Sequence, residues 1–229
     1  KMLSFISSLR AESDSFAIFV TEKYEYKDSK KILSKDISKK INLFLSSLKT
    51  RKEKEEISSL DISDKKKVFI IKVKNKYHNN YFEEVGGSFF TYIKKHQTVS
   101  SVDIYADSLS EEKNKLTKIF SEFIFGFNLK SYTLNKYKTL NKEKINKKID
   151  YKIISLNKTN IENNYKYYNA IKEGVFLARD LVSEPPNVLN PENYVKEIKK
   201  LSKLGLKIKA YNEKELKGLG LNALLGVGL

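Results

Sequence analysis

The chain has 229 residues, no cysteine and a formal net charge of +16. The lack of cysteine excludes a disulfide framework and thiolate metal sites. No apolar run approaches the ~18 residues that a membrane-spanning helix needs, and the first residues lack the pattern of a secretory signal peptide. We therefore expect a cytoplasmic protein that has no membrane partner.

The positive charge is unevenly distributed along the chain. Residues 1–158 carry 33 basic and 20 acidic side chains, whereas residues 159–229 carry 11 and 8. This asymmetry supports two units with different surfaces. Almost all basic residues are lysines, and lysine lacks the bidentate geometry with which arginine reads guanine. Any binding to nucleic acid should therefore be weak and independent of sequence.

Short apolar runs alternate with helical patterns in the first two thirds of the chain. The runs predict buried strands at residues 16–20, 68–73, 102–106 and 151–156. Apolar residues spaced by three or four positions predict helices at residues 33–48, 82–93 and 116–127. Strand–helix alternation of this kind predicts an α/β sandwich with a mixed, largely parallel sheet.

Two consecutive glycines, Gly86 and Gly87, lie inside the second predicted helix. Each should cost about 1 kcal/mol relative to alanine in a helix interior. Close packing of the helix on the sheet would compensate for this cost. A phosphate-binding loop is the alternative reading of the pair.

A lysine-rich segment at residues 130–152 has few apolar residues and is expected to be an exposed connection. Past the last predicted strand, apolar side chains from Ile161 to Val182 recur at steps of three and four. This spacing predicts a helix of about six turns. Arg179 and Asp180 in its last turns are expected to form charge-assisted bonds that fix the corner after it.

The prolines define that corner. Pro186 and Pro185 each exclude the α conformation from the residue before them, so the helix must stop near Ser183. Asn190 is a good N-cap for a second helix, and Pro191 suits its first position, where a missing N–H costs nothing. The corner fits either a turn within one domain or a junction between two domains.

Two runs in this region carry a family resemblance. The residues from Ala178 to Val182 read Ala-Arg-Asp-Leu-Val, and those from Pro186 to Pro191 read Pro-Asn-Val-Leu-Asn-Pro. Together they resemble the domain junction of the leucyl aminopeptidase (cytosol aminopeptidase) family. The segment from Tyr132 through Tyr137-Lys138-Thr139 resembles the family too. The tail from Leu221 to Gly228 resembles the strand that enters the family's catalytic domain, although Leu229 departs from the polar residue usual there.

The resemblance implies three parts. Residues 1–158 would form a macro-domain-like, three-layer α/β/α N-terminal domain. Residues 159–184 would form a linker helix, and residues 185–229 would begin the catalytic α/β domain. We call the following residues the hinge residues: Arg179, Asp180, Pro185, Pro186, Asn187, Asn190 and Pro191. They are expected to be structural rather than catalytic.

The resemblance also implies a function for the parent protein. It would be an exopeptidase that releases N-terminal amino acids from peptides, uses two divalent metal ions (Mn or Zn) and assembles as a homo-hexamer. In the family, the metal ligands lie in the later half of the chain.

Within residues 1–229 we expect no catalytic, cofactor-binding or metal-ligating residue. His78 and His96 are the only two histidines and lack metal-ligand spacing. This chain alone is therefore expected to be inactive, as the front part of a longer protein. The alternatives are a non-catalytic basic module that binds nucleic acid, or an assembly domain of the hexamer.

Overall fold

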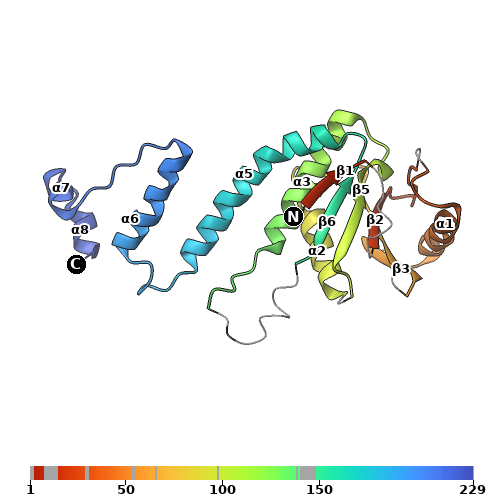
Figure 1. The fold of residues 1–229 in the computed structure, drawn as a ribbon, viewed down its shortest axis with the longest axis horizontal. Coiled ribbons are helices and arrows are strands. Elements are labelled where there is room, and N and C mark those ends of the chain that lie inside the picture. The colour runs from red at the N-terminus through yellow and green to blue at the C-terminus, as the bar shows by residue number, and fades with distance from the viewer. Residues whose placement is uncertain are drawn as a thin grey trace. The chain divides into compact units, whose positions relative to one another are not determined.

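The computed structural model divides the chain into two compact units, Lys1–Leu177 and Ala178–Leu229. Figure 1 shows the ribbon of both units. The structure describes residues 3–7, 15–28, 31–52, 55–64, 66–96, 98–137, 139 and 148–228. Part of the predicted connection at 130–152 (residues 138 and 140–147) and Leu229 thus lie outside the described residues. In the described part, no helix is long and apolar enough to cross a membrane.

The first unit is built on a six-stranded sheet with the order β1-β6-β5-β2-β4-β3. The strands are β1 (Leu3–Ile6), β2 (Ser15–Val20), β3 (Ile57–Ser63), β4 (Lys66–Lys72), β5 (Ser101–Tyr105) and β6 (Asp150–Ile154). All neighbouring strands are parallel except the edge strand β3, which is antiparallel to β4. The predicted mixed, largely parallel sheet is confirmed.

Helices cover both faces of this sheet (Figure 1). The helices of the first unit are α1 (Lys35–Thr50), α2 (Tyr81–Lys95), the 3-10 turn η1 (Ala106–Ser108) and α3 (Lys113–Ser131); α5 (Lys158–Val182) starts in this unit. One apolar core lies under α1, and the other lies under α2, α3 and the first turns of α5. The three-layer α/β/α arrangement follows from these two cores.

Both strands that the sequence patterns missed lie at the edges of the sheet. β1 has only four residues, none of them fully buried. β3 has only three apolar residues, separated by serines and Asp61, with Ile57 in one core and Leu60 and Ile62 packed against the other. Its pairing with β4 shifts register between Asp61 and Ser63. Edge strands of natural proteins are often short or bulged, which weakens their apolar signal.

The glycine pair in α2 serves helix–helix packing rather than packing on the sheet or phosphate binding. A β-carbon on Gly86 would overlap the backbone carbonyl of Phe123 in α3. One on Gly126 of α3 would overlap the carbonyl of Glu83 in α2. The two backbones touch at these glycines, and this contact compensates for the low helix propensity of Gly86.

The second unit contains α6 (Pro191–Lys199), the 3-10 segment η2 (Lys200–Leu204), α7 (Glu213–Gly218) and α8 (Asn222–Gly228). Leu206, Ile208 and Ala210 alternate as a strand would, but the backbone there is irregular. The tail expected as a strand is the helix α8. Both strand predictions are wrong for this structure, because the described part of this unit offers no partner strand. The tail satisfies its backbone groups within the helix α8 instead.

Candidate functional site

The predicted corner after α5 forms as local chemistry requires. α5 ends at Val182, one residue before the predicted stop. The backbone N–H of Val188 and of Leu189 both donate to the carbonyl of Pro185, at 2.9 Å each, which closes a turn over Pro186 and Asn187. The prolines therefore terminate the helix and start a compact turn.

Asn190 and Pro191 start α6. The Asn190 side chain accepts a hydrogen bond from the backbone N–H of Asn193 at 2.9 Å, and Pro191 occupies the first helical position. The Asn193 side chain in turn donates to the carbonyl of Val188 at 2.9 Å. The predicted N-cap is confirmed. It fixes the direction in which the chain leaves the turn.

Arg179 and Asp180 lie in the last turns of α5. Arg179 is half-buried and Asp180 is exposed. The role of these two residues and of the corner as a fixed domain junction remains a prediction.

The described part of the second unit has no core of its own. None of its residues up to Val227 is buried, and large apolar side chains are exposed throughout. They include Val182, Tyr194, Leu204, Leu206, Leu219, Leu224 and Val227. A stable domain buries such side chains. The second unit thus has the large apolar side chains that form a core, but its described residues do not bury them.

The two histidines have structural surroundings. His78 is exposed, with its Nε2 3.5 Å from the carboxylate of Glu84. His96 ends α2, and its ring packs against Phe69 and Tyr92. Across the described ranges, no group of three His, Asp or Glu residues is placed to hold a metal ion. The residues present there do not fit a two-metal centre.

The carboxyl edge of the sheet is filled by the protein itself. Parallel α/β sheets bind ligands where the loops after neighbouring strands leave in opposite directions, which here is between β2 and β5. The buried Ser108 accepts from the N–H of Phe19 at 2.8 Å, and its carbonyl accepts from the N–H of Lys27 at 2.9 Å. Tyr105 donates its hydroxyl to Asp28 at 3.2 Å. Side chains and loops thus close the crevice.

Asp28 is fully engaged by this closure. Its carboxylate also accepts the backbone N–H groups of Ile32, at 2.9 Å, and Leu33, at 3.1 Å. Burial raises the pKa of the Tyr105 hydroxyl well above its usual range, and the Asp28 charge raises it further. The neutral tyrosine therefore remains the donor of this bond. The arrangement is structural, and it orders the segment leading into α1.

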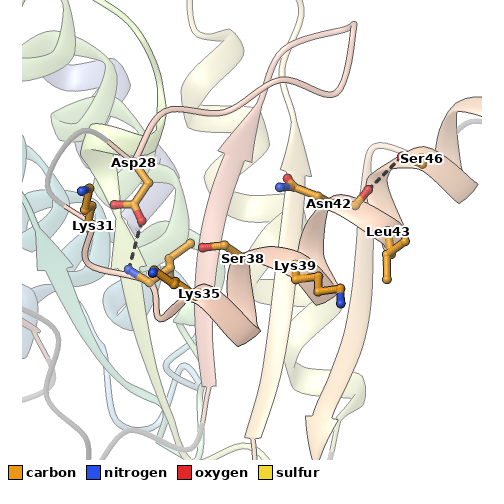
Figure 2. A pocket seen from close by; sticks show the side chains of 9 residues that line it. Asp28, Lys31, Lys35, Ser38, Lys39, Asn42, Leu43 and Ser46 are labelled. Carbon is orange, nitrogen blue, oxygen red and sulfur yellow. Dashed lines mark hydrogen bonds between the residues drawn. The ribbon is translucent and has the colours of Figure 1, made fainter.

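The outer face of α1 carries a basic groove of about 630 Å³ (Figure 2). Its lining residues are Asp28, Lys31, Leu33, Lys35, Ser38, Lys39, Asn42, Leu43 and Ser46. The sequence pattern predicts only the apolar, buried face of this helix. Lysines at every fourth position indicate a basic row on the opposite face. Only the fold shows that no described carboxylate lies within ion-pair distance of them.

Comparisons with known proteins agree on one family. The sequence model for the catalytic domain of the cytosol aminopeptidase family matches residues 176–229. A probable cytosol aminopeptidase of Agrobacterium fabrum is 39% identical over 145 residues, which cover 62% of this chain and 28% of that protein. One of Phytoplasma mali is 36% identical over 147 residues, which cover 63% and 29%. The chain thus spans less than a third of these relatives.

Solved structures share the fold. A mutant of tomato leucine aminopeptidase aligns with a TM-score of 0.74 at 18% identity, over 95% of this chain and 46% of that one. The bottromycin maturation enzyme BotP in complex with Mn aligns with a TM-score of 0.62 at 15% identity, over 91% and 40%. At these identities the likeness supports the α/β fold alone.

Proposed function

We propose, from the premise that this chain belongs to the cytosol aminopeptidase family, that it is the N-terminal portion of a metal-dependent leucyl aminopeptidase. The intact enzyme would release N-terminal amino acids from peptides by hydrolysis. The groups that perform this hydrolysis would lie outside residues 1–229. Residues 1–229 themselves would form the N-terminal domain, the linker that positions the catalytic domain, and the first part of the catalytic domain.

The observation that carries this proposal is the contrast between the two units. The first unit holds two complete apolar cores. The second unit matches the catalytic-domain model of the family, yet its described residues bury nothing. Exposed core-type side chains at the start of a known domain are expected when the rest of that domain supplies the packing.

The proposed division of the chain follows from the same contrast. Residues 1–158 would be the N-terminal domain, 159–184 the linker and 185–229 the beginning of the catalytic domain. The only buried residues of α5 are Ile161 and Tyr165, in its first two turns. Along the rest of α5 the side chains are half-buried or exposed, and a helix that is anchored in one core at its start is suited to be a linker.

The metal ions of the proposed enzyme would be two divalent ions, Mn or Zn. Two such ions would activate the attacking water and polarise the peptide carbonyl. The described residues of this chain do not fit such a centre, so no step of the chemistry is assigned to them. One structural relative, the bottromycin maturation enzyme BotP, is in complex with Mn, which supports Mn as the first metal to test.

The family membership also supports the proposed partners. Peptides would be substrates of the intact enzyme, and a homo-hexamer would be its assembly. A cytoplasmic location is proposed from the relatives, which are named cytosol aminopeptidases.

A chimaera tests the proposal. Residues 1–229 would replace the corresponding segment of the Phytoplasma mali relative, and release of leucine from a leucyl-anilide would be measured with Mn²⁺ or Zn²⁺. We expect activity from the chimaera and none from residues 1–229 alone. Turnover by the isolated chain would contradict the proposal. So would an inactive, folded chimaera beside an active parent relative.

A further inference from the structure

Strand β3 is an edge of the sheet and pairs with β4 alone (Figure 1). The N–H of Lys72 donates to the carbonyl of Glu56 at 2.8 Å, which makes these two residues a hydrogen-bonded pair. Hydrogen-bonded and non-hydrogen-bonded pairs alternate along an antiparallel ladder. The N–H and C=O groups of Ile57, Ser59 and Asp61 therefore face away from β4.

This outward row of backbone groups is free along much of the strand. Among the described residues, no hydrogen bond engages the outward groups of Ile57, Ser59 and Asp61. Beyond them, the ammonium of Lys40 in α1 donates to the carbonyl of Ile62 at 3.1 Å. The free edge thus covers residues 57–61, about 17 Å of extended chain. An unpaired row of this kind is a template for another strand.

A groove of about 790 Å³ lies between the start of β3 and the exposed face of α2. Ile57 and Tyr92 line it, and the Tyr92 hydroxyl donates to the Ser59 hydroxyl at 3.4 Å. Gly87 also lies in the lining, where it leaves the helix surface without a side chain. The side chains of a strand paired with β3 would point alternately to the two faces of the sheet, so every second one would lie on the side of this groove.

The charge around this edge is opposite to that of the whole chain. Residues 55–64 contain four acidic and no basic side chains, although the net charge of the chain is +16. Glu55, Glu56 and Glu84 line the groove and are exposed. Glu56 is 3.7 Å from Lys74, and Glu84 is 3.5 Å from His78. Both contacts are long and exposed, so these carboxylates are accessible to an external cation.

The lining also contains two lysines, Lys95 and Lys130. Lys95 lies about 16 Å along α2 from Glu84. The groove therefore has an acidic end near the start of β3, and the basic side chains of a partner fit that end.

We propose that the free edge of β3 binds an extended peptide segment with lysine or arginine side chains, as a seventh strand of the six-stranded sheet. The peptide backbone pairs with Ile57, Ser59 and Asp61, and its basic side chains lie against the glutamates of the groove. In strand addition, main-chain bonds give affinity and pockets for alternate side chains give selectivity. The inference goes beyond the proposed function, because it concerns the first unit alone and does not depend on peptidase activity.

Other partners fit this edge less well. A second copy of β3 would place acidic side chains against acidic ones, which destabilises strand pairing. The same carboxylates repel the phosphates of nucleic acid. A partner helix needs an apolar groove, whereas most of this lining is polar or charged. A basic strand meets none of these obstacles.

Binding of a short synthetic peptide to the whole chain tests the proposal. The probe is Lys-Val-Lys-Val-Lys with blocked ends and a fluorescent label, and its anisotropy is measured at about 150 mM salt, where long-range attraction is screened. The matched peptide is Glu-Val-Glu-Val-Glu. We expect weak binding of the lysine peptide and about tenfold weaker binding of the glutamate peptide, although the net charge of the chain favours the acidic one.

Two N-methylated forms of the lysine peptide test for strand pairing. One carries the methyl groups on the lysine nitrogens of the backbone, and the other carries them on the valine nitrogens. Only every second residue of a strand directs its N–H towards a given neighbour. One form should therefore lose binding while the other keeps it. Equal affinities of the two forms would show that the peptide backbone is not paired with β3.

A proline at Ser59 tests the edge from the side of the protein. Ser59→Pro removes an N–H that faces away from β4, which is where edge strands tolerate proline, and its ring blocks the incoming strand. We expect a loss of affinity of about tenfold or more. Ser59→Ala is the matched control, because it keeps the N–H and should bind as the parent does. If Ser59→Pro does not fold, the two N-methylated peptides decide the question of pairing.

Two triple variants test the role of charge. The groove variant carries Glu55→Gln, Glu56→Gln and Glu84→Gln, and should bind the lysine peptide about tenfold more weakly. The control carries the same change of charge at exposed glutamates outside the groove lining, as Glu112→Gln, Glu162→Gln and Glu173→Gln. It should bind as the parent does. Circular dichroism and urea midpoints equal to those of the parent would show that both fold.

Three further results would overturn the proposal. Equal losses in the two triple variants would mean that net charge alone sets the affinity. Tighter binding of the glutamate peptide than of the lysine peptide would mean that the acidic edge does not select its partner. No binding of the lysine peptide at up to about 1 mM would remove the site altogether.

Discussion

Gly86 of α2 and Gly126 of α3 meet across a helix–helix contact that leaves no room for a side chain at either position. A β-carbon at Gly86 would overlap the carbonyl of Phe123, and one at Gly126 would overlap the carbonyl of Glu83. Backbone atoms cannot move aside as a flexible side chain can. This contact therefore fixes how closely the two helices pack.

Replacing Gly86 by alanine should force α2 and α3 apart. Overpacking of a core typically costs 1–3 kcal/mol, occasionally more, and we expect Gly86→Ala to cost about 3 kcal/mol in the free energy of unfolding. Urea unfolding measures it.

Gly87→Ala is the matched control for this variant. A β-carbon at Gly87 would meet its nearest atom, the carbonyl oxygen of Gly126, at an ordinary 3.7 Å. The better helix propensity of alanine should then stabilise the protein by up to about 1 kcal/mol. Equal and small changes in both variants would show that the helices are not in backbone contact.

The glycine contact also illustrates what sequence patterns can predict. Periodicity placed α2 and α3, and the cost of Gly86 in a helix indicated a compensating contact. The partner, Gly126, lies on a separate helix, and no local pattern links the two. Likewise β3 is an edge strand whose few apolar residues are separated by serines and Asp61. The run around Ile208 alternates as a strand would, but the described part of the second unit contains no strand for it to pair with.

The candidate site also combines features that the sequence predicts with features that only the fold shows. Asn190 and Pro191 act on the nearest backbone groups, so their capping role could be read from the sequence. The groove beside α1 depends on Asp28 being engaged by Tyr105, which lies far along the chain. Only the fold brings these side chains together.

Ser108 ties the loops after β2 and β5 together. Its buried hydroxyl accepts from the Phe19 N–H at 2.8 Å and donates to the Tyr105 carbonyl at 2.6 Å. Ser108→Ala should leave the N–H of Phe19 buried and unpaired, at a cost of about 1–3 kcal/mol in urea unfolding.

Ser47→Ala is the control for Ser108, because the Ser47 hydroxyl is exposed and bonds only to the Phe44 carbonyl of its own helix. Its effect should stay within about 0.5 kcal/mol. If both serine variants unfold at the same urea concentration, Ser108 does not hold the crevice closed.

Buried tyrosines should make the first unit sensitive to alkali. Burial raises the pKa of Tyr165 to about 12, although a hydrogen bond from Asn128 lowers it in part. The unfolded chain loses this proton near pH 10, its ordinary pKa. The contribution of Tyr165 to stability is therefore complete below about pH 10 and is lost as the pH rises towards about 12.

The free energy of unfolding should thus fall between about pH 10 and 12, and it should fall less steeply in Tyr165→Phe. The Phe variant should be less stable at neutral pH, because Asn128 loses its partner. Urea unfolding at several alkaline pH values measures both effects. An unchanged slope in the Phe variant would show that Tyr165 ionises as easily in the folded protein as in the unfolded chain.

The cap at the start of α6 can be tested within the hinge residues. Asn190→Ala removes the acceptor for the Asn193 N–H and should weaken the helix by about 1 kcal/mol. In the chimaera with the Phytoplasma mali relative, where the rest of the catalytic domain would pack on α6, faster hydrogen exchange of the Asn193 amide should report this loss. Asn187→Ala, which changes an exposed side chain of the preceding turn, should leave that exchange rate unchanged. Equal rates in both variants would mean that Asn190 does not cap α6.

Hydrogen exchange along the whole chain tests the central claim most directly: the first unit folds on its own core and the second depends on packing from outside residues 1–229. In isolated residues 1–229, we predict strong protection for the amides of β2 and for those of the buried residues of β4, β5 and α3. The amides of α6, α7 and α8 should exchange at close to unfolded rates, since local openings there cost little. Protection of these three helices equal to that of β2 would contradict the account.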